Sequence, residues 1–131
     1  MGRKKIIIYW HKSQGDDINS QLKWICRTLG LFPIRDYNSS MYRVFIELIK
    51  DAQSERHSSS DEIAMRVGLT RGTVVHHLNN LMNSGIVIRQ DNHYILKDRN
   101  VKEMIEGIRT EINELFDEMD RAAENIDKYL E

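Results

Sequence analysis

One stretch of the sequence combines arginine, histidine, asparagine and small residues at helical spacing. If Val74, Leu78 and Leu81 face inward on a helix that starts near residue 71, a different set lies on the outer face. Its members are Arg71, Gly72, Val75, His76, Asn79, Asn80 and Asn83. Arginine can donate to two acceptors on guanine, asparagine can pair with adenine, and a valine can pack against the methyl group of thymine. This face therefore predicts contacts with base edges in the major groove of a duplex.

Residues beside this face have the chemistry to hold phosphate groups. Thr70, Gly72 and Thr73 lie where the helix begins, and backbone amides at the positive end of a helix bind anions. Arg89 and His93 flank a polar turn further along the chain. No Asp or Glu lies between Thr70 and the apolar run that precedes this turn, so no local carboxylate would repel a polyanion.

Residue patterns for catalysis and for metal binding are absent from the sequence. There is no glycine-rich phosphate loop, no HExxH pair, and no Ser or Cys nucleophile with an evident partner. The single cysteine, Cys26, cannot form an intramolecular disulfide, and its place on an apolar helical stripe favours a buried thiol. His76 and His77 are adjacent, so on a helix they point about 100° apart and cannot share one ion. We expect no enzymatic activity, no catalytic residues, no cofactor and no metal.

Capping and turn residues predict the elements that position the polar face. Ser59-x-x-Glu62 is a capping box, so a short helix begins there. This helix ends at Gly68, which can adopt positive φ, and Thr70 stands where the next helix would be capped. On that second helix His77 lies on the inward side, which indicates a packed, hydrogen-bonded histidine.

Two apolar runs follow this pair of helices. They cover residues 86–88 and 94–96, and the polar turn Gln90-Asp91-Asn92 separates them, which predicts a β-hairpin. Helix, glycine-centred turn, helix and hairpin are the elements of a winged helix-turn-helix domain. The second helix of such a domain enters the major groove, and the hairpin lies beside the phosphates.

The sequence of this region resembles the DNA-binding segment of ArsR-like transcriptional regulators. The similar stretch runs from Asp61 to Leu81 (DEIAMRVGLTRGTVVHHLNNL) and continues in Ser84-Gly85-Ile86-Val87. It shares with that family the Ile-Ala pair, the Gly-Leu-Thr turn, the Thr-Val start of the recognition helix and the His-Leu pair. The resemblance covers about residues 41–97 and implies a winged-helix regulator that binds double-stranded DNA.

The same resemblance raises the question of metal ligands, because ArsR-like proteins include metal sensors. Where the thiolate pair of that family would fall, this chain has Ile63-Ala64-Met65-Arg66. The other common site uses His and carboxylates of the terminal helix, and residues 98–131 contain no histidine. Metal sensing is therefore not expected.

Apolar periodicity predicts helices on both sides of this region. A helix over residues 17–29 follows the cap candidates Asp16-Asp17 and ends at Gly30, and another begins at Ser39 or Ser40. The run Ile6–Trp10 predicts a short strand.

Residues after Asn100 form a heptad pattern of about four repeats, which predicts a long helix that pairs with a second copy. Besides Val101, the seam comprises Ile105, Ile108, Ile112, Leu115, Met119, Ala122, Ile126 and Tyr129. Asn100-x-x-Glu103 can cap its start. Phe116, Ala123 and Leu130 widen the apolar face, so we expect a third helix there, supplied by residues 17–29.

The net charge of −1 conceals a separation of charge along the chain. Residues 100–131 hold four basic and ten acidic residues, a net −6, so the other residues carry +5. A basic body beside an acidic tail allows one part to approach a polyanion while the other stays away. The longest apolar run is too short to cross a bilayer, so we expect a soluble, cytoplasmic protein without a membrane partner.

These observations predict a mainly α fold with a small β-hairpin, a winged helix-turn-helix with a long C-terminal dimerisation helix. The expected divisions are an N-terminal extension (1–36), a DNA-binding domain (37–98) and a coiled-coil helix (99–131). The expected function is a homodimeric, sequence-specific regulator of transcription. The alternative is a winged-helix module that assembles a protein complex, and the sequence does not identify a small-molecule effector.

Overall fold

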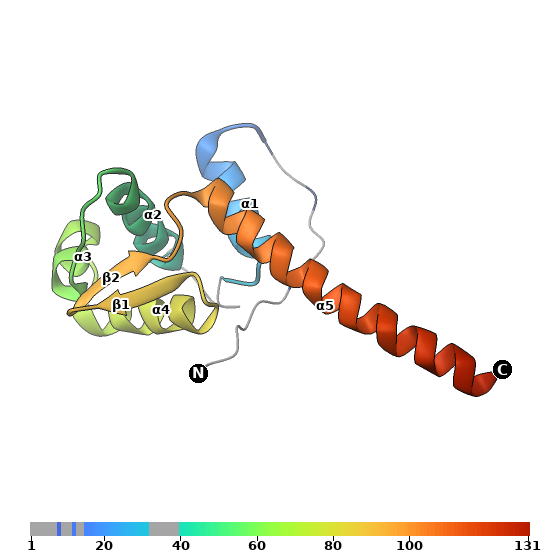
Figure 1. The fold of residues 1–131 in the computed structure, drawn as a ribbon. Coiled ribbons are helices and arrows are strands. Elements are labelled where there is room, and N and C mark those ends of the chain that lie inside the picture. Colours follow the sequence, from blue (N-terminus) through green and yellow to red (C-terminus); the bar gives the residue numbers. More distant parts are fainter. Residues whose placement is uncertain (1–7, 9–11, 13–14, 32–39) are drawn as a thin grey trace.

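The structure is a computed structural model that describes residues 8, 12, 15–31 and 40–131. The described residues form five helices and one hairpin, in the order shown in Figure 1. The elements are α1 (Ile18–Thr28), α2 (Ser40–Gln53), α3 (Ser60–Val67), α4 (Arg71–Asn83), β1 (Val87–Gln90), β2 (His93–Leu96) and α5 (Val101–Leu130). This order confirms the predicted winged helix-turn-helix fold. The strand predicted at Ile6–Trp10 and the cap candidate Ser39 lie outside the described residues, apart from Ile8.

Local side-chain bonds begin and end the helices as the sequence predicts. Ser59 and Glu62 form both hydrogen bonds of the capping box of α3, and Gly68 ends that helix with φ +67°. Thr70 caps α4 by accepting a hydrogen bond from the Thr73 amide, at 3.2 Å. Asn100 caps α5 in the same way, with a distance of 2.8 Å to the Glu103 amide. Each cap satisfies an amide that the helix itself leaves without a partner.

The hairpin is one residue pair longer than the apolar runs indicate. Gln90 pairs with His93, so only Asp91 and Asn92 form the loop. Both loop residues have positive φ, 48° and 66°. A two-residue loop of this kind follows the right-handed twist of the strands, and Asp and Asn tolerate it. The Tyr94 amide also donates to the Ser58 carbonyl at 2.9 Å, which ties the hairpin to the start of α3.

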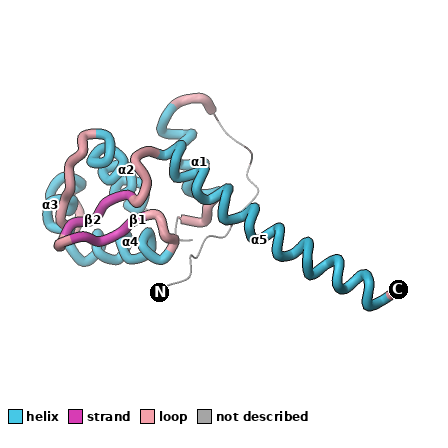
Figure 2. Tube along the Cα trace, in the orientation of Figure 1, coloured by secondary structure: helices cyan, strands magenta, loops and turns pink. Residues whose placement is uncertain are grey.

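Helix α2 lies at the centre of the domain. It packs against α3, α4 and β2, and its Val44 and Phe45 are completely buried. Val74, Leu78 and Leu81 of α4 face the same core, as the apolar spacing predicts. In Figure 2 the hairpin and the helices α2, α3 and α4 form one body, from which α5 projects.

The long helix α5 belongs to the domain only over its first part. Met104 and Ile108 are buried in the core of the same chain, whereas every residue from 113 onward is exposed. Helix α1 lies beside this first part, and Ile25 of α1 and Leu29, which follows the helix, line an apolar groove together with Ile105 of α5.

The packing of α1 differs from the sequence prediction in its position along α5. The widened face at Phe116, Ala123 and Leu130 was expected to receive this helix, but all three residues are exposed. The amphipathic face of α1 is short, and burying Leu22 and Cys26 in the domain core fixes it at the domain end of α5. Among the described residues, no helix is long and apolar enough to cross a membrane.

Candidate nucleic-acid interface

The outer face of α4 is open over its whole length. Arg71, Gly72, His76 and Asn79 are exposed, and a Cβ added at Gly72 would meet no atom within 4 Å. Val75, Asn80 and Thr73 are half-buried at the edges of this face. The structure therefore brings the predicted base-contacting residues together on one accessible helical surface.

The first turn of α4 combines hydroxyl groups and unpaired amides. The Thr70 hydroxyl accepts from the Thr73 amide and also lies 2.9 Å from the Thr73 hydroxyl, so both side chains are oriented by the cap itself. The amides of Arg71 and Gly72 precede the first residue that can bond within the helix. The positive end of the helix dipole lies at these amides, so they can donate hydrogen bonds to a phosphate oxygen.

His77 connects α4 to α2 and does not reach the outer face. It is only 5% exposed, and its Nε2 lies 2.6 Å from the Ser40 hydroxyl. The predicted packed, hydrogen-bonded histidine is therefore confirmed. Its neighbour His76 points outward, 5.7 Å away between ring centroids, and stays available at the surface.

A buried ionic cluster, which the sequence analysis missed, fixes α3 against α2. Asp51, at the end of α2, is 1% exposed and accepts from Arg56 Nε at 2.8 Å. Two nitrogens of Arg66 on α3 reach its two carboxylate oxygens, each at 3.2 Å, and Arg66 also donates to Ser58 at 2.7 Å. The Glu47 carboxylate lies 3.4 Å from Arg66 as well. A bidentate pair of this kind restricts both distance and angle between the two helices.

The pKa of Asp51 shows which influence dominates in the cluster. Burial raises the pKa, but hydrogen bonds from Ser58, Arg56 and Arg66 outweigh burial and hold the pKa below its usual value. The carboxylate is therefore charged at neutral pH and pairs with the two arginines. The sequence signal for it is weak, since an aspartate on an apolar helical face is readily taken for an exposed end of the helix.

Arg71 lies close to Asp61, an acidic residue of the preceding helix α3. Its Nε lies 3.3 Å from the Asp61 carboxylate of α3, and both side chains are largely exposed, at 68% and 74%. An exposed pair of this kind contributes little to stability and is easily exchanged for another anion. The guanidinium of Arg71 is thus oriented at the start of α4 without being held there.

The wing presents its basic side chain at the tip of the hairpin. Arg89 donates to Asn92 across the loop at 3.2 Å, and its guanidinium lies 5.7 Å from the Tyr94 ring centroid. His93 is half-buried and lies 6.5 Å from the His57 ring. Arg89 and α4 belong to the same body, because β1 packs against α4.

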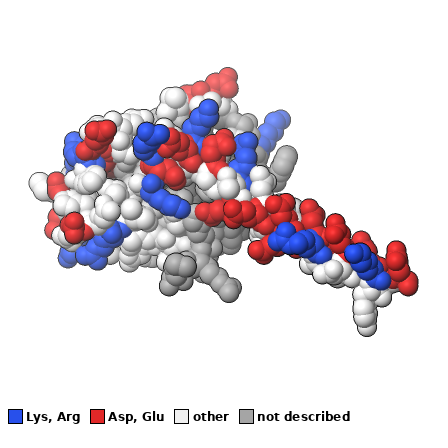
Figure 3. Space-filling view, viewed as in Figure 1, with Lys and Arg blue, Asp and Glu red and all other residues white. Residues whose placement is uncertain are grey.

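Charge is separated in space as well as along the chain. In Figure 3 acidic side chains dominate the visible surface of α5, together with a few basic ones. This helix extends away from the domain in Figure 1, whereas α4 and the hairpin lie on the domain itself. The acidic helix therefore does not cover the face that would meet a polyanion.

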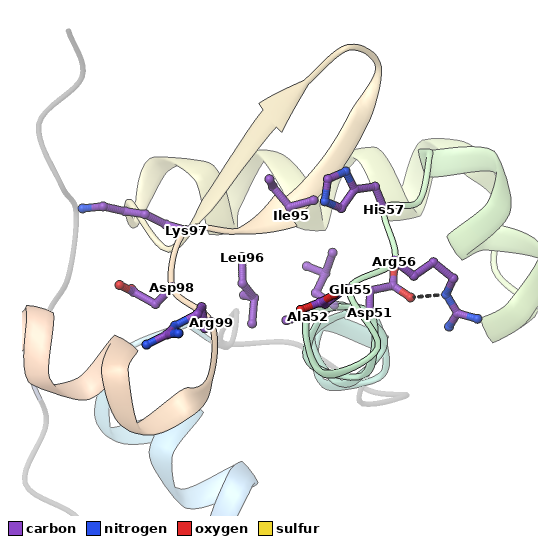
Figure 4. Close-up of a pocket in the computed structure, with 11 residues that line it drawn as sticks. Asp51, Ala52, Glu55, Arg56, His57, Ile95, Leu96, Lys97, Asp98 and Arg99 are labelled. Carbon is purple, nitrogen blue, oxygen red and sulfur yellow. Dashed lines mark hydrogen bonds and ion pairs between the residues drawn. The ribbon is translucent and has the colours of Figure 1, made fainter.

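A second hollow lies between the end of α2 and the link from β2 to α5. It has a volume of about 200 Å³, and Figure 4 shows Asp51, Arg56, His57, Asp98 and Arg99 around it. The Asp51 carboxylate there is already bonded to Arg56, as the dashed line marks. We assign this hollow no chemistry.

The described part of the chain offers neither a cluster of metal ligands nor a reactive thiol. No group of three or more His, Cys, Asp or Glu residues there could hold a metal ion. Cys26 is completely buried in the core, and burial raises the pKa of its thiol to about 12. The predicted buried thiol is thus confirmed, and its high pKa makes it unreactive.

Comparison with known protein families finds a match to the central segment. Residues 53–89 match the family model described as bacterial regulatory protein, arsR family. The matched segment runs from the end of α2 through α3 and α4 into β1, so it contains the whole candidate recognition helix. A search of curated proteins found no match. This segment is therefore similar to the helix-turn-helix of the arsR family, and the likeness supports a DNA-binding transcriptional regulator.

Proposed function

We propose that this protein is a homodimeric regulator that binds specific sequences of double-stranded DNA. The observation that carries the proposal is the open outer face of α4, on which Arg71, His76 and Asn79 are exposed within the segment that matches the arsR family. These side chains can distinguish base pairs, whereas a lysine-rich helix would bind any duplex.

In this proposal α4 lies in the major groove and the hairpin lies beside the DNA backbone. Val75 and Asn80, at the edges of the face, complete the contacts to the bases, while Thr70, Gly72 and Thr73 meet a phosphate at the helix start. Arg89 and His93 of the wing bind phosphates. The hydrogen bond between Ser40 and His77 and those that Arg66 donates to Asp51 hold α4 and α3 in a fixed position relative to α2.

Helix α5 supplies the contact between two copies. Its seam from Leu115 to Tyr129 is exposed, while Ile108 is buried in the core of its own chain and Ile105 and Ile112 are half-buried against that core. Two copies present two recognition helices, and binding energy adds over two half-sites. In this proposal residues 37–98 bind DNA, residues 99–131 dimerise, and no effector is assigned.

The first experiment selects bound sequences from a library of random duplexes with the full-length protein. Enrichment of a two-fold symmetric motif supports the proposal. Recovery of unselected sequences, or of none, refutes specific binding and leaves the winged-helix module for protein assembly as the better account.

The second experiment separates base contacts from phosphate contacts. Asn79→Ala or Arg71→Ala should cost about 1–3 kcal/mol on the selected duplex and little on random DNA. Arg89→Ala should lower the affinity for both duplexes alike. It should also reduce the steepness of log affinity against log salt by about two for a symmetric dimer. Arg99→Ala is the matched control, because this exposed arginine pairs with Glu103 near the start of α5, away from α4. Equal losses on both duplexes for the α4 variants, with altered specificity for Arg89→Ala, would reverse the assignment.

A further inference from the structure

The projecting part of α5 carries a row of large apolar side chains that the chain itself does not cover. Their exposed fractions range from 45% for Met119 to 89% for Tyr129. The row comprises Leu115, Phe116, Met119, Ile126, Tyr129 and Leu130. Uncharged surface runs along one edge of this helix in Figure 3, below the acidic side chains. Exposed apolar rows of this extent mark surfaces for another protein chain.

We propose that this row pairs antiparallel with the same row of a second copy, in one register. The inference rests on the homodimer proposed above and specifies its direction and contacts. In this register Leu115 meets the partner's Ile126, and Met119 meets the partner's Ala122. Ile112 then meets the partner's Tyr129. The two-fold axis crosses α5 between residues 120 and 121.

The sizes of the facing side chains favour this register over a parallel pair. The antiparallel register places large residues against small ones, with Phe116 beside the partner's Ala123, so the layers interdigitate. A parallel pair would set Ala122 against the partner's Ala122, which leaves a gap between the helices. It would also place Glu111 beside the partner's Phe116, so a carboxylate would border the apolar seam.

A longer antiparallel register, which begins near the start of α5, is excluded by two observations. It pairs Ile108 with the partner's Met119, yet Ile108 is only 6% exposed and packs in its own domain. It also brings Glu111 beside the partner's Glu118 twice in each dimer, which repels like charges. The shorter register leaves Ile105 and Ile108 in their own domain and uses the exposed residues from Leu115 onward together with the half-buried Ile112.

The exposed row is large enough for a stable contact. At roughly half exposure, side chains of this size present on the order of 100 Å² each, so six present on the order of 600 Å² per copy. Two copies together then cover about 1,200 Å², which is the lower bound for specific interfaces. The acidic side chains on the rest of the helix stay in solvent.

Disulfide cross-linking between single-cysteine variants tests direction and register together. Leu115→Cys and Ile126→Cys are made in the full-length protein, one of them with a larger tag, and are mixed and oxidised. Both positions are exposed and lie outside the domain, so the variants keep its fold. Native Cys26 is completely buried and serves as the internal control, since the unmodified protein should not cross-link. In the proposed register residue 115 faces the partner's residue 126 within disulfide range. In a parallel pair the same two positions are offset by 11 residues, which separates them by about 16 Å along the helix.

The expected result is a mixed disulfide between the two variants and little disulfide of either variant with itself. Self-linking of each variant would show parallel helices and overturn the inference. A dimer without either link, or one that links Ile112→Cys to Leu115→Cys, would show another register and overturn it as well. A protein that sediments as a monomer at tens of micromolar overturns both the inference and the homodimer. DNA binding is measured separately, so an antiparallel dimer that binds no duplex would refute the proposed function alone.

Discussion

Replacing Asp51 by alanine should destabilise the domain strongly, although Asp51 touches none of the proposed DNA contacts. The carboxylate is 1% exposed and accepts one hydrogen bond from Arg56 and two from Arg66. Asp51→Ala leaves both guanidinium groups without this partner. The side chain of Arg66 is 28% exposed and that of Arg56 52%, so water replaces part of the loss.

The magnitude follows from these exposures. Removing one partner of a fully buried ion pair costs about 3–5 kcal/mol, and the partial exposure of both arginines reduces this to about 2–4 kcal/mol. For a chain of this size the melting temperature should fall by about 8–15 °C. Because Arg66 connects α3 to α2, the orientation of the helix-turn-helix should loosen as well, and DNA affinity should fall with stability.

The assay is urea unfolding at one fixed protomer concentration, since association adds to the apparent stability. Asp61→Ala is the matched control, because this carboxylate is 74% exposed and its removal should change the free energy of unfolding by less than about 0.5 kcal/mol. A cost below about 1 kcal/mol for Asp51→Ala would refute the reasoning, since it would mean that the cluster does not fix α3 to α2.

The same cluster predicts a dependence of stability on pH. The pKa of Asp51 lies below its ordinary 3.8 in the folded protein, so the folded state binds this proton less readily than the unfolded state. The contribution is therefore complete above pH 3.8 and is lost as pH falls from there through the folded pKa. Acid titration of unfolding should show this loss in the native protein and a smaller one in Asp51→Ala.

Three further predictions concern assembly, metals and DNA. The double variant Ile112→Glu with Leu115→Lys places charges in the seam of α5, and burying them unpaired would cost several kcal/mol of association free energy. Monomers should therefore appear in sedimentation, and a dimer that persists at tens of micromolar would contradict the seam. Zinc, cadmium or arsenite should leave DNA affinity within about threefold, and release of bound DNA by any of them would reveal a missed site. In the proposed register the two copies of Val101 are about 58 Å apart, and α4 belongs to the domain from which α5 projects (Figure 1). Selected half-sites should thus be centred about two helical turns apart, and a spacing of one turn would contradict the register.

Short-range patterns predicted much of this protein correctly because they depend on neighbours in sequence. The box of Ser59 and Glu62, the turn at Gly68 and the cap at Thr70 join residues at most three positions apart, and all are present. The inward position of His77 followed from helical periodicity alone. These features define the helix-turn-helix and the face of α4.

Contacts between distant residues were decided only by the tertiary structure. Arg66 lies 15 residues from Asp51, and no periodicity indicates which of many arginines approaches a buried aspartate. Arg71 meets Asp61 across a turn, although the chain around Arg71 contains no acid. The place of α1 on α5 was decided similarly, because the long seam offered equivalent apolar positions and the domain core fixed α1 at one end. Periodicity in the sequence states which face of a helix is apolar, whereas packing of the whole chain selects the surface that covers it.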